Sequence, residues 1–212
     1  MDIRDRVSTD VLDYQQLTSL LRDYAKPRDR ISALLAGDNL IRVRKGLYIF
    51  GDRYRRGPVQ REILANLVYG PSYISLDYAL SHYGLIPERV EDVTSMTTGE
   101  NKRFSTPIGV FTYQHIPLQR YSVGIRWVND NDQSYLIATP EKALIDKVWT
   151  DKRFKPGRLE DYEDYFFADL RLDEGQVMEL DAGRMTEIAN IFHARKITML
   201  CRFLETYKGN QQ

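Results

Sequence analysis

The segment LIRVRKGLYIF, residues 40–50, decides the fold expected for the first quarter of the chain. β-Branched and aromatic residues lie on both sides of Lys45-Gly46, a dipeptide that can turn the chain. The segment therefore predicts a β-hairpin of two short strands. Arg42 and Arg44 make this hairpin basic.

Two helices are expected before the hairpin. The first follows the N-cap candidates Ser8–Asp10 and carries an apolar stripe at helical spacing, formed by Leu17, Leu20, Leu21 and Tyr24. Pro27 suits the first position of a second helix, and Gly37 suits its end. Two helices and a basic hairpin predict a winged helix-turn-helix over residues 1–57.

The second helix is the expected recognition helix. Ile31, Leu34 and Leu35 form its inner face, so the opposite face is available for the major groove. Arg30 and Ser32 are the candidates for base edges, whereas Lys26 and Arg28 are the candidates for phosphates. In the hairpin, Arg42, Arg44 and Lys45 are candidates for phosphate or minor-groove contacts. Arg53, Arg55 and Arg56 are expected to extend this basic surface.

The distribution of charge agrees with a nucleic-acid contact. The net charge is zero, yet residues 22–61 hold eleven Lys or Arg against four Asp or Glu. The remaining residues are acidic on balance, as expected for a basic contact surface on a separate scaffold. A solvated basic loop with no partner is the alternative interpretation.

Residues 58–212 predict a larger α+β domain, with strands and helices to about residue 150 and helices after that. Helices are expected at 58–69, from Ser75 to Gly84, and from Thr139 to Trp149; strands are expected at 93–98, 103–108, 110–116, 121–128 and 134–138. The overall prediction is an α+β chain with a helical C-terminus.

Composition and motifs exclude several classes of protein. No apolar segment resembles a signal peptide or a membrane span, and the single Cys201 allows no internal disulfide, so a cytoplasmic chain is expected. The sequence contains no phosphate-binding loop, dinucleotide fingerprint or nucleophile elbow, and the scattered histidines predict no metal site. We therefore expect no enzyme, no catalytic residue and no cofactor.

Two short polar groups in the larger domain could contact a partner. Ser72, Tyr73 and Ser75 are candidates for such contacts, although turn and N-cap roles are the alternative. Glu141 and Lys142 are further candidates. With Asp146 they could suggest a nuclease, but helix capping, a Lys142–Asp146 pair and solvation explain the spacing better.

Several segments together resemble the AbiEi antitoxin family of bacterial transcriptional regulators in type IV toxin-antitoxin systems. The hairpin segment 40–50 resembles that family's wing, and PSYISLDYALSHYGLIPE, residues 71–88, resembles the start of its second domain. The match continues at VTSMTT (93–98), GVFTYQHI (109–116) and IATPEKALIDKV (137–148). The resemblance covers about residues 10–150.

The resemblance implies a repressor that binds inverted repeats in its own promoter. Inverted repeats in double-stranded DNA would be met by two copies, either preassembled or pairing on the DNA. It also implies opposition to a nucleotidyltransferase-like toxin, which need not involve a stable complex. The wing positions that match the family are Arg42, Arg44, Lys45, Gly46 and Tyr48, and the family's DNA-binding role is expected there. The alternative is a module that binds the toxin directly and has a vestigial winged helix, and a weaker one is an enzyme acting on the toxin or its substrate.

Overall fold

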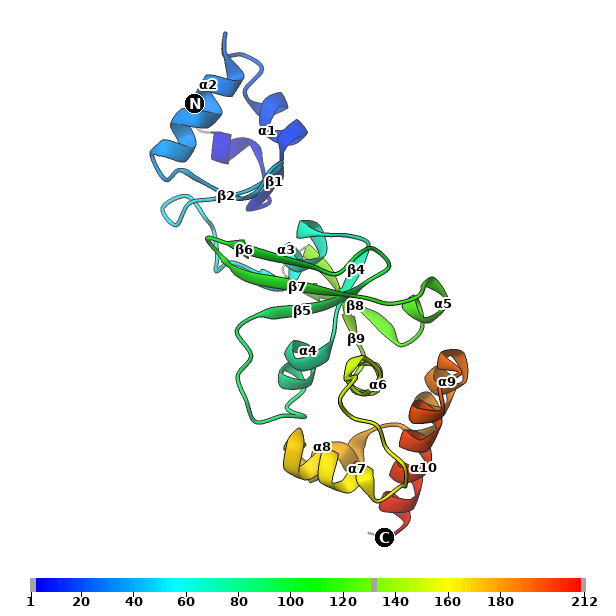
Figure 1. Cartoon of the computed structure of the whole chain (residues 1–212). Coiled ribbons are helices and arrows are strands. Elements are labelled where there is room, and N and C mark those ends of the chain that lie inside the picture. The colour runs from blue at the N-terminus through cyan, green and yellow to red at the C-terminus, as the bar shows by residue number, and fades with distance from the viewer. Residues whose placement is uncertain (1–2, 131–132, 211–212) are drawn as a thin grey trace.

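The protein has an α+β fold with two β-sheets and a helical C-terminus, as the sequence predicts (Figure 1). The computed structural model describes residues 3–130 and 133–210. We call residues 3–57 the N-terminal unit and the remaining described residues the body. Buried side chains form two clusters, an N-terminal core and a larger main core.

The N-terminal unit consists of short helices on one side of a small sheet. Its elements are η1 (Ile3–Arg6), β1 (Val11–Asp13), α1 (Tyr14–Leu20), α2 (Pro27–Ala36), β2 (Leu40–Arg44) and β3 (Leu47–Phe50). The strands are antiparallel in the order β1-β3-β2, so the hairpin predicted at residues 40–50 is present. The helices α1 and α2 lie on the side of this sheet that faces away from the body (Figure 1).

The first helix begins later than the sequence suggests. Residues 11–13 form β1, which pairs with β3, and Asp13 is the N-cap residue in place of Ser8–Asp10. The Asp13 carboxylate accepts a hydrogen bond from the Gln16 amide, and the Gln16 side chain accepts one from the Asp13 amide. The local N-cap signal at Ser8–Asp10 was misleading because pairing with a distant strand determines this segment.

The second helix has the predicted limits. Pro27 is its first residue, and Gly37 is its C-cap. The chain then turns through Asp38, whose φ is 53°, and passes close to Gly51. A Cβ atom on Gly51 would lie 1.8 Å from the Asp38 carbonyl oxygen, so only glycine fits there.

The central strand of the small sheet, β3, is buried on both faces. Leu12, Tyr48 and Phe50 belong to the N-terminal core, whereas Leu47 and Ile49 belong to the main core. Successive residues of a strand point to opposite faces, so β3 joins the two cores with alternate side chains. The domain boundary predicted near residue 57 stays a prediction, and the packing adds that the hairpin is anchored on the body.

The body contains a six-stranded mixed sheet with strand order β6-β7-β5-β4-β9-β8. The pairs β5/β7 and β4/β9 are parallel, and the other pairs are antiparallel. The strands are β4 (Ser72–Ile74), β5 (Val93–Thr97), β6 (Lys102–Thr106), β7 (Gly109–His115), β8 (Ile125–Asp130) and β9 (Gln133–Ala138). The helices interspersed with them are α3 (Arg61–Val68), α4 (Leu76–His82), α5 (Leu118–Tyr121) and α6 (Pro140–Thr150).

The sequence predicts most of these elements, with two clear errors. The strand β4 was not predicted, because its residues were considered only for turn, N-cap or partner-contact roles. A strand was expected over residues 121–128, but residues 118–121 form the short helix α5 and β8 starts at Ile125. The residues that start α6 behave as predicted. Thr139 caps the helix by accepting a hydrogen bond from the Lys142 amide, and Pro140 is the first helical residue.

The C-terminal part is helical and lies at the end of the molecule opposite the N-terminal unit (Figure 1). It contains α7 (Asp161–Asp164), the π-helical turn η2 (Tyr165–Asp169), α8 (Glu174–Glu179), α9 (Ala182–Phe192) and α10 (Arg195–Asn210). Aromatic side chains join the first of these helices to α10, with Tyr162 and Phe203 stacked at 5.7 Å. Among the described residues, no helix is long and apolar enough to cross a membrane.

Candidate nucleic-acid interface

Helix α2 presents its candidate residues to solvent. Ile31 and Leu34 are buried in the N-terminal core, whereas Lys26, Arg28, Arg30 and Ser32 are exposed. Within residues 3–130 and 133–210, no carboxylate lies within 4.0 Å of the Lys or Arg side chains in this set. Their charges are therefore available to a polyanion.

The two base-edge candidates point in different directions. Residues two positions apart on a helix are separated by about 160° around its axis, so Arg30 and Ser32 lie on different flanks. The Arg30 guanidinium lies over the Tyr24 ring at 5.3 Å, and the Ser32 hydroxyl donates to the Arg28 carbonyl oxygen at 3.2 Å. The outermost face of α2 between these flanks carries Asp29 and Ala33, both exposed.

The hairpin turn is held against α1. Gly46 has a φ of 87°, which favours glycine, and its carbonyl oxygen accepts a hydrogen bond from the Tyr14 amide at 3.0 Å. Arg42, Arg44 and Lys45 are exposed beside this turn. Among the described residues, no carboxylate forms an ion pair with any of these three side chains.

Arg44 lies close to the body. Burial raises the pKa of the Tyr113 hydroxyl on β7, and the charge of Arg44 opposes this rise by lowering that pKa. The Tyr113 hydroxyl donates to the Ala65 carbonyl oxygen of α3. Val43 and Leu47 of the hairpin are buried in the main core, so the hairpin does not project freely, and the exposed Arg44 lies near the seam between the N-terminal unit and the body.

Two residues assigned to the basic surface have other roles. Tyr48 is only 5% exposed and belongs to the N-terminal core, so the expected DNA contact at Tyr48 is wrong for this conformation. Its place in β3, the central strand of the small sheet, explains its burial. Arg55 binds the Phe50 and Gly57 carbonyl oxygens and the Asp52 carboxylate, so it supports the chain after β3. Arg53 and Arg56 are exposed.

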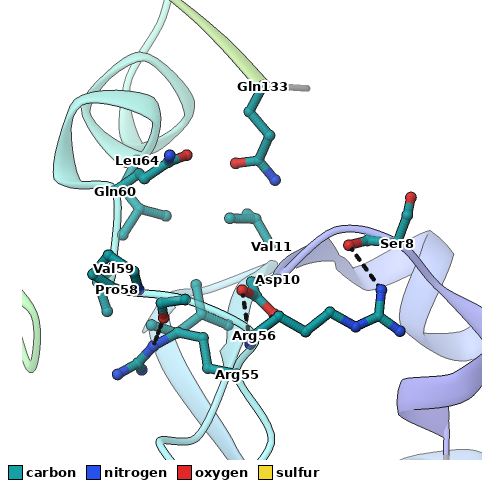
Figure 2. Close-up of a pocket in the computed structure, with 12 residues that line it drawn as sticks. Ser8, Asp10, Val11, Arg55, Arg56, Pro58, Val59, Gln60, Leu64 and Gln133 are labelled. Carbon is teal, nitrogen blue, oxygen red and sulfur yellow. Dashed lines mark hydrogen bonds between the residues drawn. The ribbon is translucent and has the colours of Figure 1, made fainter. Parts of the chain in front are cut away.

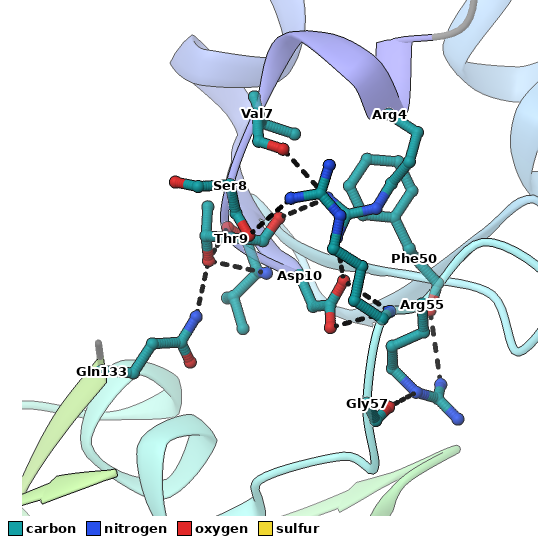
Figure 3. A network of polar contacts seen from close by, with 11 residues as sticks. Arg4, Val7, Ser8, Thr9, Asp10, Phe50, Arg55, Gly57 and Gln133 are labelled. Carbon is teal, nitrogen blue, oxygen red and sulfur yellow. Dashed lines mark hydrogen bonds and ion pairs between the residues drawn. The ribbon is translucent and has the colours of Figure 1, made fainter. Parts of the chain in front are cut away.

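A buried arginine that the sequence analysis missed organises the base of the N-terminal unit (Figure 3). Arg4 is 6% exposed and forms an ion pair with Asp10 at 2.8 Å. Its guanidinium also donates to the Thr9 carbonyl oxygen and lies 4.6 Å from the centre of the Phe50 ring. The local sequence MDIRDR looks like a polar tail, and only the fold brings Phe50 against it.

A hydrogen bond between distant residues links the N-terminal unit to the body (Figure 3). The Gln133 side-chain amide donates to the Thr9 hydroxyl at 2.7 Å. On one side of this bridge lies a hollow of about 360 Å³, lined by both parts and by the connecting residues 55–60 (Figure 2). The Asp10 carboxylate closes one wall by accepting from the Arg56 amide. The orientation of the N-terminal unit thus depends on polar contacts as well as on β3.

The polar residues proposed for partner contact are buried. Ser72, Tyr73, Ser75, Glu141 and Lys142 are all less than 5% exposed, so a surface contact through their side chains is wrong for this conformation. The expected Lys142–Asp146 pair is present at 2.7 Å, but both side chains are 0% exposed, so solvation is not part of its explanation. The segments 71–88 and 137–148 meet at this pair.

The cluster around Asp146 satisfies both carboxylate oxygens. Tyr73 donates to one oxygen at 2.9 Å and Ser75 donates to it at 2.8 Å, while Lys142 binds the other oxygen. The Lys142 ammonium also donates to the Arg120 carbonyl oxygen and lies over the Phe192 ring. Burial lowers the pKa of Lys142 and raises that of Tyr73. A buried, hydrogen-bonded ion pair of this kind joins the packed segments of the body and is not accessible to a partner.

The described residues include no group of three His, Cys, Asp or Glu side chains placed to hold a metal ion. Cys201 is buried, and this burial raises the pKa of its thiol to about 11. Reactive cysteines are thiolates near neutral pH, so the environment of Cys201 disfavours a nucleophilic role.

The comparisons with known proteins give information on the fold alone. No protein-family model matches the chain, and no curated protein matches it significantly. Among solved structures, the chain resembles the crystal structure of the RV2827C protein from Mycobacterium tuberculosis, with a TM-score of 0.59. The alignment covers 95% of this chain and 74% of that chain at 15% sequence identity, so the similarity concerns the α+β fold alone.

Proposed function

We propose that the chain is a DNA-binding transcriptional repressor whose N-terminal unit is a winged helix-turn-helix. The observation that carries this proposal is a group of exposed basic side chains, on α2 and beside the hairpin turn, without ion-pair partners among the described residues. The element order supports it, because α1 and α2 precede a β-hairpin and α2 lies on the outer side of the sheet.

The proposed docking places α2 in the major groove. Ala33 and Ala36 on its exposed face would allow a close approach, while Arg28 and Arg30 on its two flanks would reach phosphates or base edges. Arg42 and Lys45 beside the turn would contact the neighbouring backbone. Two copies would be needed to read inverted repeats in the chain's own promoter.

A salt titration of DNA binding tests this proposal. The probe is a duplex containing the sequence upstream of the chain's own gene, followed by fluorescence anisotropy at several salt concentrations. Each lost phosphate contact should reduce the slope of log affinity against log salt by about 0.9. The variant R42A/R44A/K45A should therefore flatten the slope by about two to three units.

A matched control removes three exposed charges elsewhere. Lys152, Arg153 and Lys155 lie in the segment after α6, far along the chain from the hairpin. The variant K152A/R153A/K155A has the same net charge as the hairpin variant and should keep the parental slope. Equal slopes for both variants and the parent protein would refute DNA binding through the hairpin and favour a protein-interaction role.

We further propose that this repressor acts as the antitoxin of a type IV system and opposes a nucleotidyltransferase-like toxin without being an enzyme. The resemblance of residues 40–50, 71–88 and 137–148 to the AbiEi family supports this. Expression of the adjacent gene should arrest growth, and co-expression of this chain should relieve the arrest. Relief by the hairpin variant R42A/R44A/K45A would show that neutralisation does not need DNA binding, and growth arrest that persists with the parent chain would refute the antitoxin role.

A further inference from the structure

A second hollow lies between the N-terminal unit and the body, next to the Thr9–Gln133 bridge. It has a volume of about 600 Å³, which is within the range of small-molecule sites. Val11 and Leu47 line it from the N-terminal unit, and Leu67, Tyr121 and Trp127 line it from the body. We call this hollow the inter-unit groove.

Two large apolar side chains of the groove remain open to solvent. Trp127 on the edge strand β8 is 68% exposed, and Leu67 on α3 is 47% exposed. Most large apolar side chains among the described residues are buried, and these two are among the five that are exposed. In a concave site the indole ring of Trp provides a flat apolar face for a ring, and the Leu side chain adds apolar contact.

The groove also contains a hydrogen-bonding group that the described protein does not use. Ser72 lines the groove and is 3% exposed, and its hydroxyl has no hydrogen-bond partner among the described residues. A buried hydroxyl without a partner is costly, and most such groups are satisfied by protein, water or ligand. Ser72 is thus an independent indication of a bound polar group.

The charge of the lining restricts the ligand. The described lining residues include no Lys, Arg or His, and they include one carboxylate, that of Asp13. Asp13 accepts one hydrogen bond from the Gln16 amide as N-cap of α1. Because a carboxylate accepts through two oxygens, capacity remains for a cation. An indole face also attracts cations, so Trp127 and Asp13 both favour a positively charged ligand.

We propose that the inter-unit groove binds a small aromatic molecule that is neutral or singly positive. The ring contacts Trp127 and Leu67, a polar substituent binds the Ser72 hydroxyl, and a positive group lies near Asp13. Both units line the groove, so occupancy is linked to the position of the N-terminal unit on the body. This site does not depend on the proposed repressor function.

Three probes of similar size and different charge test the site in the full chain. They are benzylamine, benzyl alcohol and benzoate, each titrated to about 10 mM, a range suited to fragments of eight or nine heavy atoms. Binding is followed by the fluorescence of the W149F variant, in which Trp127 is the remaining tryptophan, and by amide chemical-shift changes in the parent chain. Benzylamine should bind best, benzyl alcohol less well and benzoate least.

Single substitutions show which side chains of the groove contact the probes. L67A should weaken the binding of all probes that bind, whereas L118A should not, since Leu118 is an equally apolar side chain, 73% exposed, outside the groove. S72A should weaken benzyl alcohol about fivefold, the effect of one hydrogen bond. D13N keeps a residue suited to N-capping and should abolish the preference for benzylamine over benzyl alcohol.

The outcomes decide the proposal without any measurement of DNA binding. If no probe changes the Trp127 fluorescence or the amide chemical shifts, the proposal is overturned. If benzoate binds as tightly as benzylamine, the proposed charge preference is overturned. Equal weakening by L67A and L118A would show non-specific association and also overturn it. Binding in the expected order, with loss in L67A alone, supports the site even if the chain does not bind DNA.

Discussion

Charged side chains lie in opposite surroundings in two regions of the molecule, the surface formed by α2 and the hairpin and the cluster around Asp146 in the body. On α2 and the hairpin, basic side chains are exposed and have no ion-pair partners among the described residues. In the body, Lys142 and Asp146 are fully buried and neutralise each other. Exposed, unpaired charges contribute little to the stability of the fold, but they attract polyanions. A buried ion pair contributes to stability only when its geometry is good, and it presents no charge to a binding partner.

The largest effect is expected for removal of one partner from the buried pair. D146A leaves the Lys142 ammonium buried without its carboxylate and removes the acceptor of Tyr73 and Ser75. The free energy of unfolding should fall by about 3–5 kcal/mol. Urea denaturation followed by circular dichroism measures this change.

A double variant separates the loss of the pair from the loss of packing. K142M/D146L removes both charges together and should recover the part of the loss that comes from a charge buried alone. The Tyr73 and Ser75 hydroxyls still lack their acceptor in this variant, so the recovery should be partial. If D146A had the same unfolding free energy as the parent, the Lys142–Asp146 pair would have to be solvated. The contrast between this pair and the exposed charges of α2 and the hairpin would then be wrong.

The next effect concerns the one buried arginine of the N-terminal unit. R4M removes the ion pair with Asp10 and the contact with the Phe50 ring, and should destabilise the unit by about 2–3 kcal/mol. Hydrogen exchange should show the loss at amides of β1 and β3, with little change at amides of β5 and β7. Uniform loss across both units would mean that they unfold as one.

A smaller effect is expected on DNA affinity from neighbouring residues of α2. R28A should flatten the salt dependence by about 0.9 if Arg28 binds one phosphate. D29N removes an exposed negative charge from the face that the proposed docking turns toward DNA, and should raise affinity about two- to fivefold, consistent with one weak surface interaction. Lower affinity for D29N, at unchanged helix content, would place the DNA on another face.

The smallest effect is expected at Tyr48. Because its side chain is buried in the N-terminal core, Y48F should leave DNA affinity within about twofold of the parent value. Anisotropy titration beside R42A provides the comparison, since Arg42 pairs with Tyr48 across the strands and is exposed. Tenfold weaker binding by Y48F would restore Tyr48 to the interface.

Local signals predicted the elements that depend on neighbouring residues. The hairpin at residues 40–50 follows from strand-forming residues on both sides of Lys45-Gly46, and α6 follows from Thr139 and Pro140. Strand β1 was missed because three residues carry almost no periodic signal, and its partner β3 lies more than thirty positions away. The helix α5 was missed for a related reason, since a single turn has no detectable period.

The candidate interface was predicted in part. The basic side chains of α2 are exposed as expected, because their helix buries an apolar stripe on its other side. The burial of Tyr48 was missed because β3 is covered on both faces, so its alternate residues are all apolar or aromatic and no outward face can be recognised. Arg4 and Gln133 carry no local signal at all, since their partners are brought near only by the fold.

The sequence alone determined the α+β class, the hairpin, the limits of α2 and the i,i+4 spacing of Lys142 and Asp146. These features depend on residues within one or two turns of each other, where propensity and spacing act directly. Only the tertiary structure decided that this pair is buried, that Tyr73 and Ser75 bind it, and that the hairpin is seated on the body. Those outcomes depend on which surfaces lose water when segments some seventy residues apart pack together, and no local pattern specifies that.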